Sequence, residues 1–255
     1  MITYRELGNM GRLGNQMFQY AALYGAGFMR GYEIGIPDKD LEISKIFKNL
    51  SAAKVEKKWS GKRYNEPSFD FNASLWLIED NMDIVGYFQS PHYWLHCSQQ
   101  VYDEFEFQDE IVTKGKEWLE KEGLTNLPLC SIHVRRGDYV NLSSYHHNLG
   151  MDYYKKGYDV MKQNIENDLS YLVFTDDPEW CKQNFSGAKV VEGNSAAVDL
   201  YLMSCCHAHI IANSSFSWWG AFLSLSQAVV APAQWFGPEG PKNWDTIYMN
   251  HWVKV

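Results

Sequence analysis

The sequence has no long apolar run. None of its stretches approaches the roughly 18 to 20 consecutive apolar residues that a membrane-spanning helix requires. Its first 20 residues contain Arg5, Glu6 and Arg12, where a secretory signal peptide would have an apolar core. We therefore expect a cytoplasmic protein with no integral membrane segment, and a peripheral place at the inner membrane face stays open.

Cysteine pairs with the spacing of redox or metal sites are also missing. The chain has five cysteines, an odd number, and no C-x-x-C motif, so neither a disulfide framework nor a zinc site is indicated. Asp176 and Asp177 stand side by side, but a helix cap and a loop carboxylate explain them without a metal. We expect no metal site.

Basic residues are too few for a nucleic-acid partner. Lys and Arg number 23 against 31 Asp and Glu, which gives a net charge of -8. Binding to duplex DNA or structured RNA needs a surplus of cations spread over one face. A content of 45% apolar, 15% aromatic and 21% charged residues is that of a globular protein. A chain of 255 residues can bury a sizeable core, in one large domain or two small ones.

Short apolar runs alternate with helical segments in the second half of the chain. The runs predict strands at 129–134, 171–175, 189–192, 209–212 and 228–231. Between them lie a helix from Pro178, with Asp177 as its N-cap, and a helix over 196–206. This alternation predicts an α/β fold with a parallel, doubly wound sheet, whose ligands bind at the carboxyl ends of the strands.

The first half opens with an expected strand over 2–7, a loop over 8–16 and a helix from about Met17. Helical spacing predicts that one face of this helix packs on a core through Met17, Tyr20, Ala21, Tyr24 and Phe28. The pattern is weaker from 38 to 110, where 84–88 is the expected strand.

A boundary between two domains is expected near residue 125. A helix over 110–122 is stopped by Gly123 and leads into Thr-Asn-Leu-Pro at 125–128, a run of turn residues. We take this run as a linker, which gives domains of residues 1–125 and 126–255.

Two adjacent arginines, Arg135 and Arg136, follow an apolar strand in the motif HVRRGDY at 133–139. Three interpretations are open: the arginines form a surface ion pair, they belong to an Arg-Gly-Asp adhesion tripeptide, or they bind a small anion. Adhesion requires display on a secreted protein, and the sequence shows no secretion signal. The anion site gains support because two further polar segments, 176–177 and 213–217, also follow predicted strands.

The segment Asn213-Ser-Ser-Phe-Ser217 runs directly into an apolar helix that begins at Trp218. Its hydroxyl groups and the free N–H groups of a helix start would face the ligand, and helix amino ends favour anions. Arginine suits phosphate because its planar fork donates two parallel hydrogen bonds. The loop over 8–14, Gly-x-x-Gly-x-x-Gly, is neither a dinucleotide fingerprint nor a P-loop. It is either a tight turn or a backbone that comes close to a phosphate or sugar.

Four blocks together resemble the α-1,2-fucosyltransferases, glycosyltransferase family 11. They are GRLGNQMFQYA (11–21), HVRRGDY (133–139), FTDD (174–177) and ANSSFSWWGA (212–221), in the order typical of that family. The resemblance implies a GT-B-like α/β architecture, with two Rossmann-like domains facing across a cleft. It further implies an inverting transfer of L-fucose from GDP-β-L-fucose, without metal or other cofactor, to the 2-hydroxyl of a terminal β-galactose on a glycan acceptor.

The resemblance also implies roles for individual residues. Arg135 would grip the pyrophosphate with Arg136 in support, and Asp138, the carboxylate of the HVRRGDY block, is the candidate general base. His133 and Asp199 would contact the guanine, although a lone acid within a helix usually faces solvent. Further donor-binding residues come from the serine block and the glycine loop: Asn213, Ser214, Ser215, Ser217, Gly11, Arg12, Gly14, Asn15 and Gln16.

The two expected domains would have different functions. Residues 1–125 would form the acceptor side, and residues 126–255 would bind the GDP-sugar. The alternatives are another GDP-sugar transferase of this fold and a non-catalytic nucleotide- or glycan-binding module.

Overall fold

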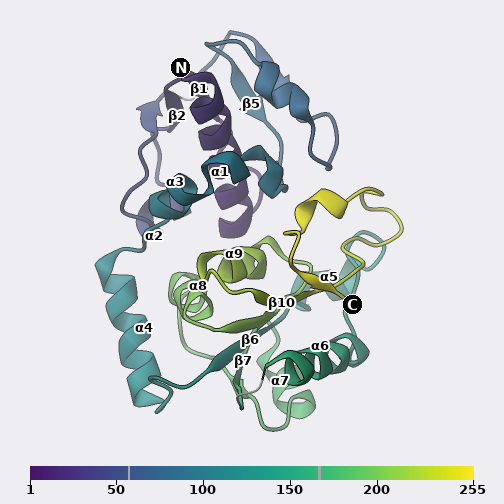
Figure 1. Ribbon diagram of the computed structural model, residues 1–255. Coiled ribbons are helices and arrows are strands. Elements are labelled where there is room, and N and C mark those ends of the chain that lie inside the picture. The colour runs from purple at the N-terminus through teal and green to yellow at the C-terminus, as the bar shows by residue number, and fades with distance from the viewer. Residues whose placement is uncertain (57, 166–167) are drawn as a thin grey trace. The chain divides into compact units, whose positions relative to one another are not determined.

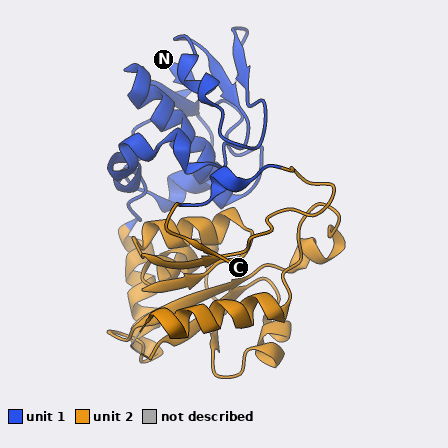
Figure 2. Ribbon diagram, turned by 45° about the vertical axis from the view of Figure 1, so that its right-hand side comes forward, with its two compact units in different colours: residues 1–108, 243–249 blue, residues 109–242, 250–255 orange. Residues whose placement is uncertain are grey.

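The computed structural model describes residues 1–56, 58–165 and 168–255, and it divides into two compact units, coloured separately in Figure 2. Unit 1 comprises Met1–Gln108 and Asn243–Met249, and unit 2 comprises Asp109–Lys242 and Asn250–Val255. Each unit has its own parallel sheet with helices packed against it. The predicted α/β class, with two Rossmann-like units of the GT-B type, is confirmed.

The sheet of unit 1 has five strands in the order β3-β2-β1-β5-β4, and every pair is parallel. The strands are β1 (Ile2–Thr3), β2 (Ile34–Pro37), β3 (Ala53–Val55), β4 (Arg63–Asn65) and β5 (Asp83–Val85). The helices of unit 1 are α1 (Leu13–Arg30), α2 (Glu42–Ile46), α3 (Ser98–Glu104) and the short 3-10 turns η1 (Ala73–Leu77), η2 (Pro91–Tyr93), η3 (Leu95–Cys97) and η4 (Asp245–Ile247).

The strands predicted for unit 1 are shorter in the structure. The strand expected over 2–7 pairs only as Ile2–Thr3, and the strand expected over 84–88 is Asp83–Val85. The second one ends at Val85 because the chain bends at Gly86, and the N–H groups of Tyr87 and Phe88 donate to the Glu66 carboxylate.

Helix α1 begins at Leu13, four residues before the expected start, and ends at Arg30, where Gly31 follows in the left-handed conformation. Met17, Tyr20 and Ala21 are fully buried, as predicted. The prediction for Phe28 is wrong, because this side chain is 51% exposed in the last turn of the helix. There its ring lies against Tyr24 and His96 at the surface.

The sheet of unit 2 has six parallel strands in the order β11-β10-β9-β6-β7-β8. They are β6 (Leu129–Val134), β7 (Ser170–Thr175), β8 (Lys189–Val190), β9 (Ala208–Ile210), β10 (Ala228–Ala231) and β11 (Val253–Lys254). The helices are α4 (Asp109–Lys121), α5 (Gly137–Asn141), α6 (Met151–Asn164), α7 (Pro178–Asn184), α8 (Ala196–Ser204) and α9 (Ser215–Leu223).

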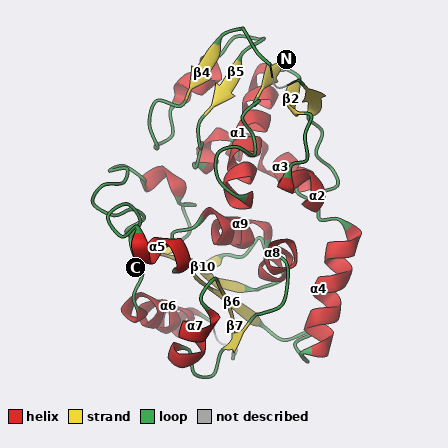
Figure 3. Ribbon diagram, turned by 180° about the vertical axis from the view of Figure 1, so that it is seen from behind, coloured by secondary structure: helices red, strands yellow, loops and turns green. Residues whose placement is uncertain are grey.

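The sheet of unit 2 is covered on both faces, as Figures 1 and 3 show. All six residues of the central strand β6 are buried. Side chains alternate along a strand, so β6 contributes to both cores. Ile132 packs with Tyr153 and Met161 of α6 on one face, whereas Leu129 packs with Leu202 of α8 on the other. The predicted doubly wound parallel sheet is confirmed.

The two units divide between Gln108 and Asp109, not at the expected boundary between 125 and 126. The reason is the packing of α4, which belongs to unit 2. A Cβ added at Gly115 of this helix would lie 2.2 Å from the Tyr201 ring of α8, so the two helices are in direct contact. The turn residues at 125–128 are therefore a loop inside unit 2 that leads from α4 to β6. No described helix is long and apolar enough to cross a membrane.

Candidate functional site

Polar residues gather at the carboxyl edge of the sheet of unit 2. Strands β6 and β7 pair up to Val134 and Thr175, so Arg135 and Asp176 are the next residues of neighbouring strands. Strand β9 pairs with β6 on its other side, and the serine block follows β9. The structure thus brings together the three strand ends that the sequence predicts to converge.

The guanidinium group of Arg135 lies between two carboxylates. Its Nη2 is 2.6 Å from Oδ1 of Asp138, and its Nη1 is 3.0 Å from Oδ2 of Asp176. The Arg135 side chain is 19% exposed, and its Cζ lies 5.5 Å from the centre of the Tyr139 ring. The planar guanidinium group is thus held near the surface in a defined orientation.

Arg136 is held by a separate set of contacts. Its Nε donates to Oδ2 of Asp177 at 3.0 Å, and its Cζ lies 4.1 Å from the centre of the Trp180 ring. Its backbone N–H donates to Oδ1 of Asp176 at 2.8 Å. The other oxygen of Asp177 accepts the N–H of Trp180, so the predicted N-cap of α7 is confirmed. The side chain of Arg136 is thus held by one ion pair and by stacking, and it is 27% exposed.

His133 is a buried, neutral imidazole. It is 6% exposed, and its Nδ1 shares a hydrogen bond of 2.9 Å with Oγ of Ser217. Burial lowers the pKa of His133 to about 4, against a smaller raising effect of the nearby Asp176 carboxylate. A neutral ring offers one N–H donor and one acceptor nitrogen.

The serine block forms the start of α9, which begins at Ser215 and not at Trp218. Oγ of Ser214 accepts the N–H of Phe216 as the N-cap, and Ser215 is the first helical residue. Ser214 and Ser215 are half-buried, so the amino end of the helix is accessible.

Asn213 and Ser217 make contacts inside the unit. Asn213 is 2% exposed, and its Nδ2 donates to the carbonyl oxygens of His147 and Trp235. Ser217 is 1% exposed and holds His133. These contacts give both residues a supporting role that the sequence does not indicate, and their role in donor binding stays a prediction.

Asp199 lies on α8 and is mostly buried. Burial raises the pKa of its carboxyl group to about 6. Its Oδ1 makes no hydrogen bond of ordinary geometry with the described residues, but the Asn194 side chain lies near enough to lower the pKa. A buried acceptor without a donor costs free energy, which a bound N–H group would recover.

The glycine loop of unit 1 connects β1 to α1. Gly11 has a φ of 85°, and a Cβ added there would lie 2.0 Å from Nδ2 of Asn15. Oδ1 of Asn15 accepts a hydrogen bond of 2.6 Å from Nε2 of Gln89. Arg12 is exposed at the N-cap position, and Gln16 is 5% exposed. Together with the buried Gly14, the predicted loop residues form one compact turn at the amino end of α1.

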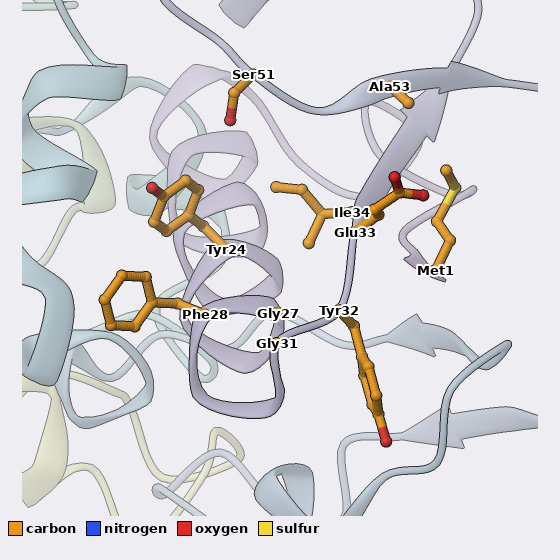
Figure 4. Close-up of a pocket in the computed structure, with 10 residues that line it drawn as sticks. All are labelled: Met1, Tyr24, Gly27, Phe28, Gly31, Tyr32, Glu33, Ile34, Ser51 and Ala53. Carbon is orange, nitrogen blue, oxygen red and sulfur yellow. The ribbon is translucent and has the colours of Figure 1, made fainter.

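A pocket of about 500 Å³ in unit 1 lies at the other end of α1 (Figure 4). Its walls include Tyr24 and Phe28 from α1, Tyr32, and Glu33 just before β2. None of the residues predicted to bind the donor lines it. An 18-residue helix is about 27 Å long, so this pocket is far from the glycine loop.

The sequence places Asp176 among the converging strand ends but does not indicate its role, which is to pair with Arg135. The pair Asp176-Asp177 is explained in the sequence as one helix cap and one loop carboxylate. The structure shows that Asp177 is the cap. The sequence does contain a signal for this ion pair, because two acids follow one predicted strand and two arginines follow another. Within the described part of the chain, no three His, Cys, Asp or Glu side chains gather as metal ligands would.

Known proteins are similar to this chain in sequence and in fold. A sequence profile of glycosyl transferase family 11 matches residues 4–255. The chain is 31% identical to an alpha-1,2-colitosyltransferase of Escherichia coli, over 96% of either chain. It is 25% identical to the galactoside 2-alpha-L-fucosyltransferase Sec1 of Mus musculus, over 96% of this chain and 72% of that one. The solved fucosyltransferase NodZ from Bradyrhizobium shares the fold, with a TM-score of 0.59 at 12% identity, over 95% of this chain and 96% of that one.

Proposed function

Because the chain belongs to glycosyl transferase family 11, we propose that it is an inverting galactoside α-1,2-fucosyltransferase. It moves L-fucose from GDP-β-L-fucose to the 2-hydroxyl group of a terminal β-galactoside. The observation that carries the proposal is the guanidinium group of Arg135, held at the carboxyl edge of a doubly wound sheet, where the neighbouring strand β9 also ends and leads to α9.

Arg135 is suited to the departing diphosphate. Negative charge grows on the GDP leaving group as the bond to fucose breaks, and a preorganised cation stabilises that charge. The planar fork of arginine matches two phosphate oxygens, and the half-buried amino end of α9 adds backbone N–H donors. We propose that these groups make a divalent metal unnecessary.

His133 and Asp199 would recognise the guanine. Guanine presents N–H donors on one edge, which suit the unpartnered Oδ1 of Asp199. Ser217 holds Nδ1 of His133, so Nε2 is the nitrogen left to meet the base. Both side chains are largely buried, which strengthens hydrogen bonds to a bound base.

Inversion requires a single in-line displacement, in which GDP leaves one face of the sugar as the galactose hydroxyl group attacks the other. A general base near that hydroxyl group accelerates the step. Asp138 is the proposed base. Its carboxylate pairs with Arg135 at 2.6 Å, so it must leave the guanidinium before it accepts a proton.

A second donor has a specific observation in its favour. The relative at 31% identity is named an alpha-1,2-colitosyltransferase. Colitose is fucose without its 3-hydroxyl group, so the two donors differ by one polar contact in the sugar site. A site built to bind that hydroxyl group would discriminate strongly against colitose.

Transfer by the purified protein tests the proposal. We expect product from GDP-fucose and β-galactosides such as lactose, with an α-1,2 linkage found by mass spectrometry and linkage analysis. Competition between GDP-fucose and GDP-colitose identifies the preferred sugar. Preference for a UDP-sugar, or tight GDP binding with no transfer to any acceptor, would contradict the proposal. Loss of turnover in EDTA would contradict metal independence.

A further inference from the structure

Two carboxylates pair with the same guanidinium group, but they are held very differently. Asp176 and Asp138 contact opposite Nη atoms of Arg135. Asp176 follows the end of β7, a strand anchored in the sheet, whereas Asp138 lies on the short helix α5. This difference in support suggests different roles when an anion reaches Arg135.

Asp176 is fixed by several contacts at once. Its Oδ1 accepts the backbone N–H of Arg136 at 2.8 Å while its Oδ2 pairs with Nη1 of Arg135. A Cβ added at Gly137 would lie 2.8 Å from Oδ2 of Asp176, so the backbone passes close over the carboxylate. Its side chain is 26% exposed. Moving Asp176 would break the connection between two adjacent strand ends.

Asp138 has much less support. Its side chain is 46% exposed, and none of the five residues of α5, Gly137–Asn141, is buried. Ion pairs at the surface contribute little to stability, so little opposes the separation of Asp138 from Arg135.

The charge balance favours such a separation when a diphosphate binds. The ion pairs at this strand edge join two guanidinium groups to three carboxylates, so the group carries one net negative charge. A diphosphate adds at least two more negative charges. Withdrawal of Asp138 removes the nearest exposed carboxylate from Arg135 and frees Nη2 for a phosphate oxygen.

We propose that Asp138 is an exchangeable counter-ion of Arg135, which the diphosphate of the donor displaces, and that Asp176 is a positioning residue that holds the guanidinium throughout. This inference rests on the proposed function to the extent that the ligand is a nucleoside diphosphate. Displacement would also free Asp138 at the moment when the donor is in place.

Opposite effects of two matched substitutions test the inference. We expect Asp138→Asn to bind GDP about 2- to 5-fold more tightly, because a competing charge worth about 1 kcal/mol or less is removed. We expect Asp176→Asn to bind GDP at least about 10-fold more weakly, because Arg135 loses its fixed charged partner. Isothermal titration calorimetry of the full chain at constant ionic strength measures both.

The control is Asp159→Asn, which removes one negative charge from an exposed residue of α6. Its GDP affinity gives the effect of net charge alone, and thermal unfolding shows whether each variant is folded. Gly137→Ala displaces the Asp176 carboxylate but keeps its charge, and we expect weaker GDP binding. This variant takes the place of Asp176→Asn if that protein does not fold.

The inference is overturned if Asp138→Asn binds GDP no more tightly than the Asp159→Asn control. It is equally overturned if neither Asp176→Asn nor Gly137→Ala weakens binding. A wild-type protein that binds UDP but not GDP contradicts the proposed donor, and the same variants then test the two carboxylates with UDP. A wild-type protein that binds neither GDP, UDP nor inorganic pyrophosphate contradicts both proposals.

Discussion

Nδ1 of His133 and Oγ of Ser217 share a hydrogen bond of 2.9 Å in the interior of unit 2. The bond joins β6 to α9, so it connects the strand that precedes the arginines to the helix that begins within the serine block. It also fixes the orientation of a neutral ring, whose other nitrogen is left for a ligand.

Ser217→Ala tests this orientation. Removal of the hydroxyl group leaves Nδ1 of His133 without its partner and lets the ring turn. A single hydrogen bond contributes about 0.5 to 1.5 kcal/mol, so the KM for GDP-fucose should rise about 2- to 12-fold, with little change in kcat. Steady-state kinetics measure the split. Ser186→Ala, an exposed serine of the same unit, should leave both constants unchanged, and an equal effect of the two substitutions would rule out this role.

Because His133 is buried as a neutral ring, the folded protein should lose stability as the pH falls. Its pKa in the folded protein is about 4, below the ordinary value of 6.5, so the unfolded chain binds the proton more readily. The stability from this group is fully present above pH 6.5 and is lost as the pH falls toward 4. Urea unfolding across this range should show a decrease on the order of 1 to 3 kcal/mol that His133→Gln reduces. Equal pH dependence in the two proteins would contradict the assignment.

Glu66 in unit 1 should change the free energy of unfolding with pH in the opposite direction. Burial raises the pKa of its carboxyl group to about 7, although the N–H groups of Tyr87 and Phe88 donate to it and lower the pKa. The folded state therefore binds this proton more tightly than the unfolded chain does. The contribution is fully present below about pH 4.5 and is lost as the pH rises through 7.

Glu66→Gln should remove this pH dependence. The amide oxygen can still accept an N–H group of the turn, but the side chain no longer titrates. The free energies of unfolding at pH 5 and pH 8 should differ less in this variant than in the wild type. The control is Glu120→Gln, a substitution at an exposed residue, which should keep the wild-type difference. If the variant and the wild type respond alike, Glu66 is not the titrating group.

The sequence predicts the central strands well and the charge network poorly. Strand β6 is an uninterrupted apolar run whose residues are all buried, so its signal is local. Strand β1 pairs over only two residues with β2 and β5, and the apolar pattern of residues 2–7 does not show where that pairing ends. Helix α6 was not predicted, although Tyr153, Gly157 and Met161 recur at helical spacing on its buried face.

The candidate site shows the same limit. The sequence identifies Arg135 because it follows a strand, His133 because it lies near the end of that strand, and the serine block because it starts a helix. It does not reveal that Asp176 pairs with Arg135, since that contact depends on the register of β6 and β7. It also does not reveal that Ser217 turns inward to hold His133.

Arg135→Ala should reduce kcat strongly. Loss of a catalytic electrostatic donor typically costs about 10²- to 10³-fold in rate. Arg135→Lys should recover little, because an ammonium group lacks the planar fork that contacts Asp176 and a phosphate together. Arg30→Ala, an exposed residue at the end of α1, is the matched control and should retain full activity. A kcat for Arg135→Ala within a few-fold of the wild type would refute the role of this guanidinium.

Gly11→Ala should impair transfer through the glycine loop, because two penalties act together there. The φ of 85° is unfavourable for alanine, and its Cβ would lie 2.0 Å from Nδ2 of Asn15. Gly31→Ala is the matched control, because its φ of 65° carries the backbone penalty, about 1 kcal/mol, while nothing lies within 4 Å of its Cβ. Both variants should lower the melting temperature, but only Gly11→Ala should lower kcat/KM for GDP-fucose. Equal loss of activity in the two would mean that the loop matters for stability alone, since the clash with Asn15 is what separates them.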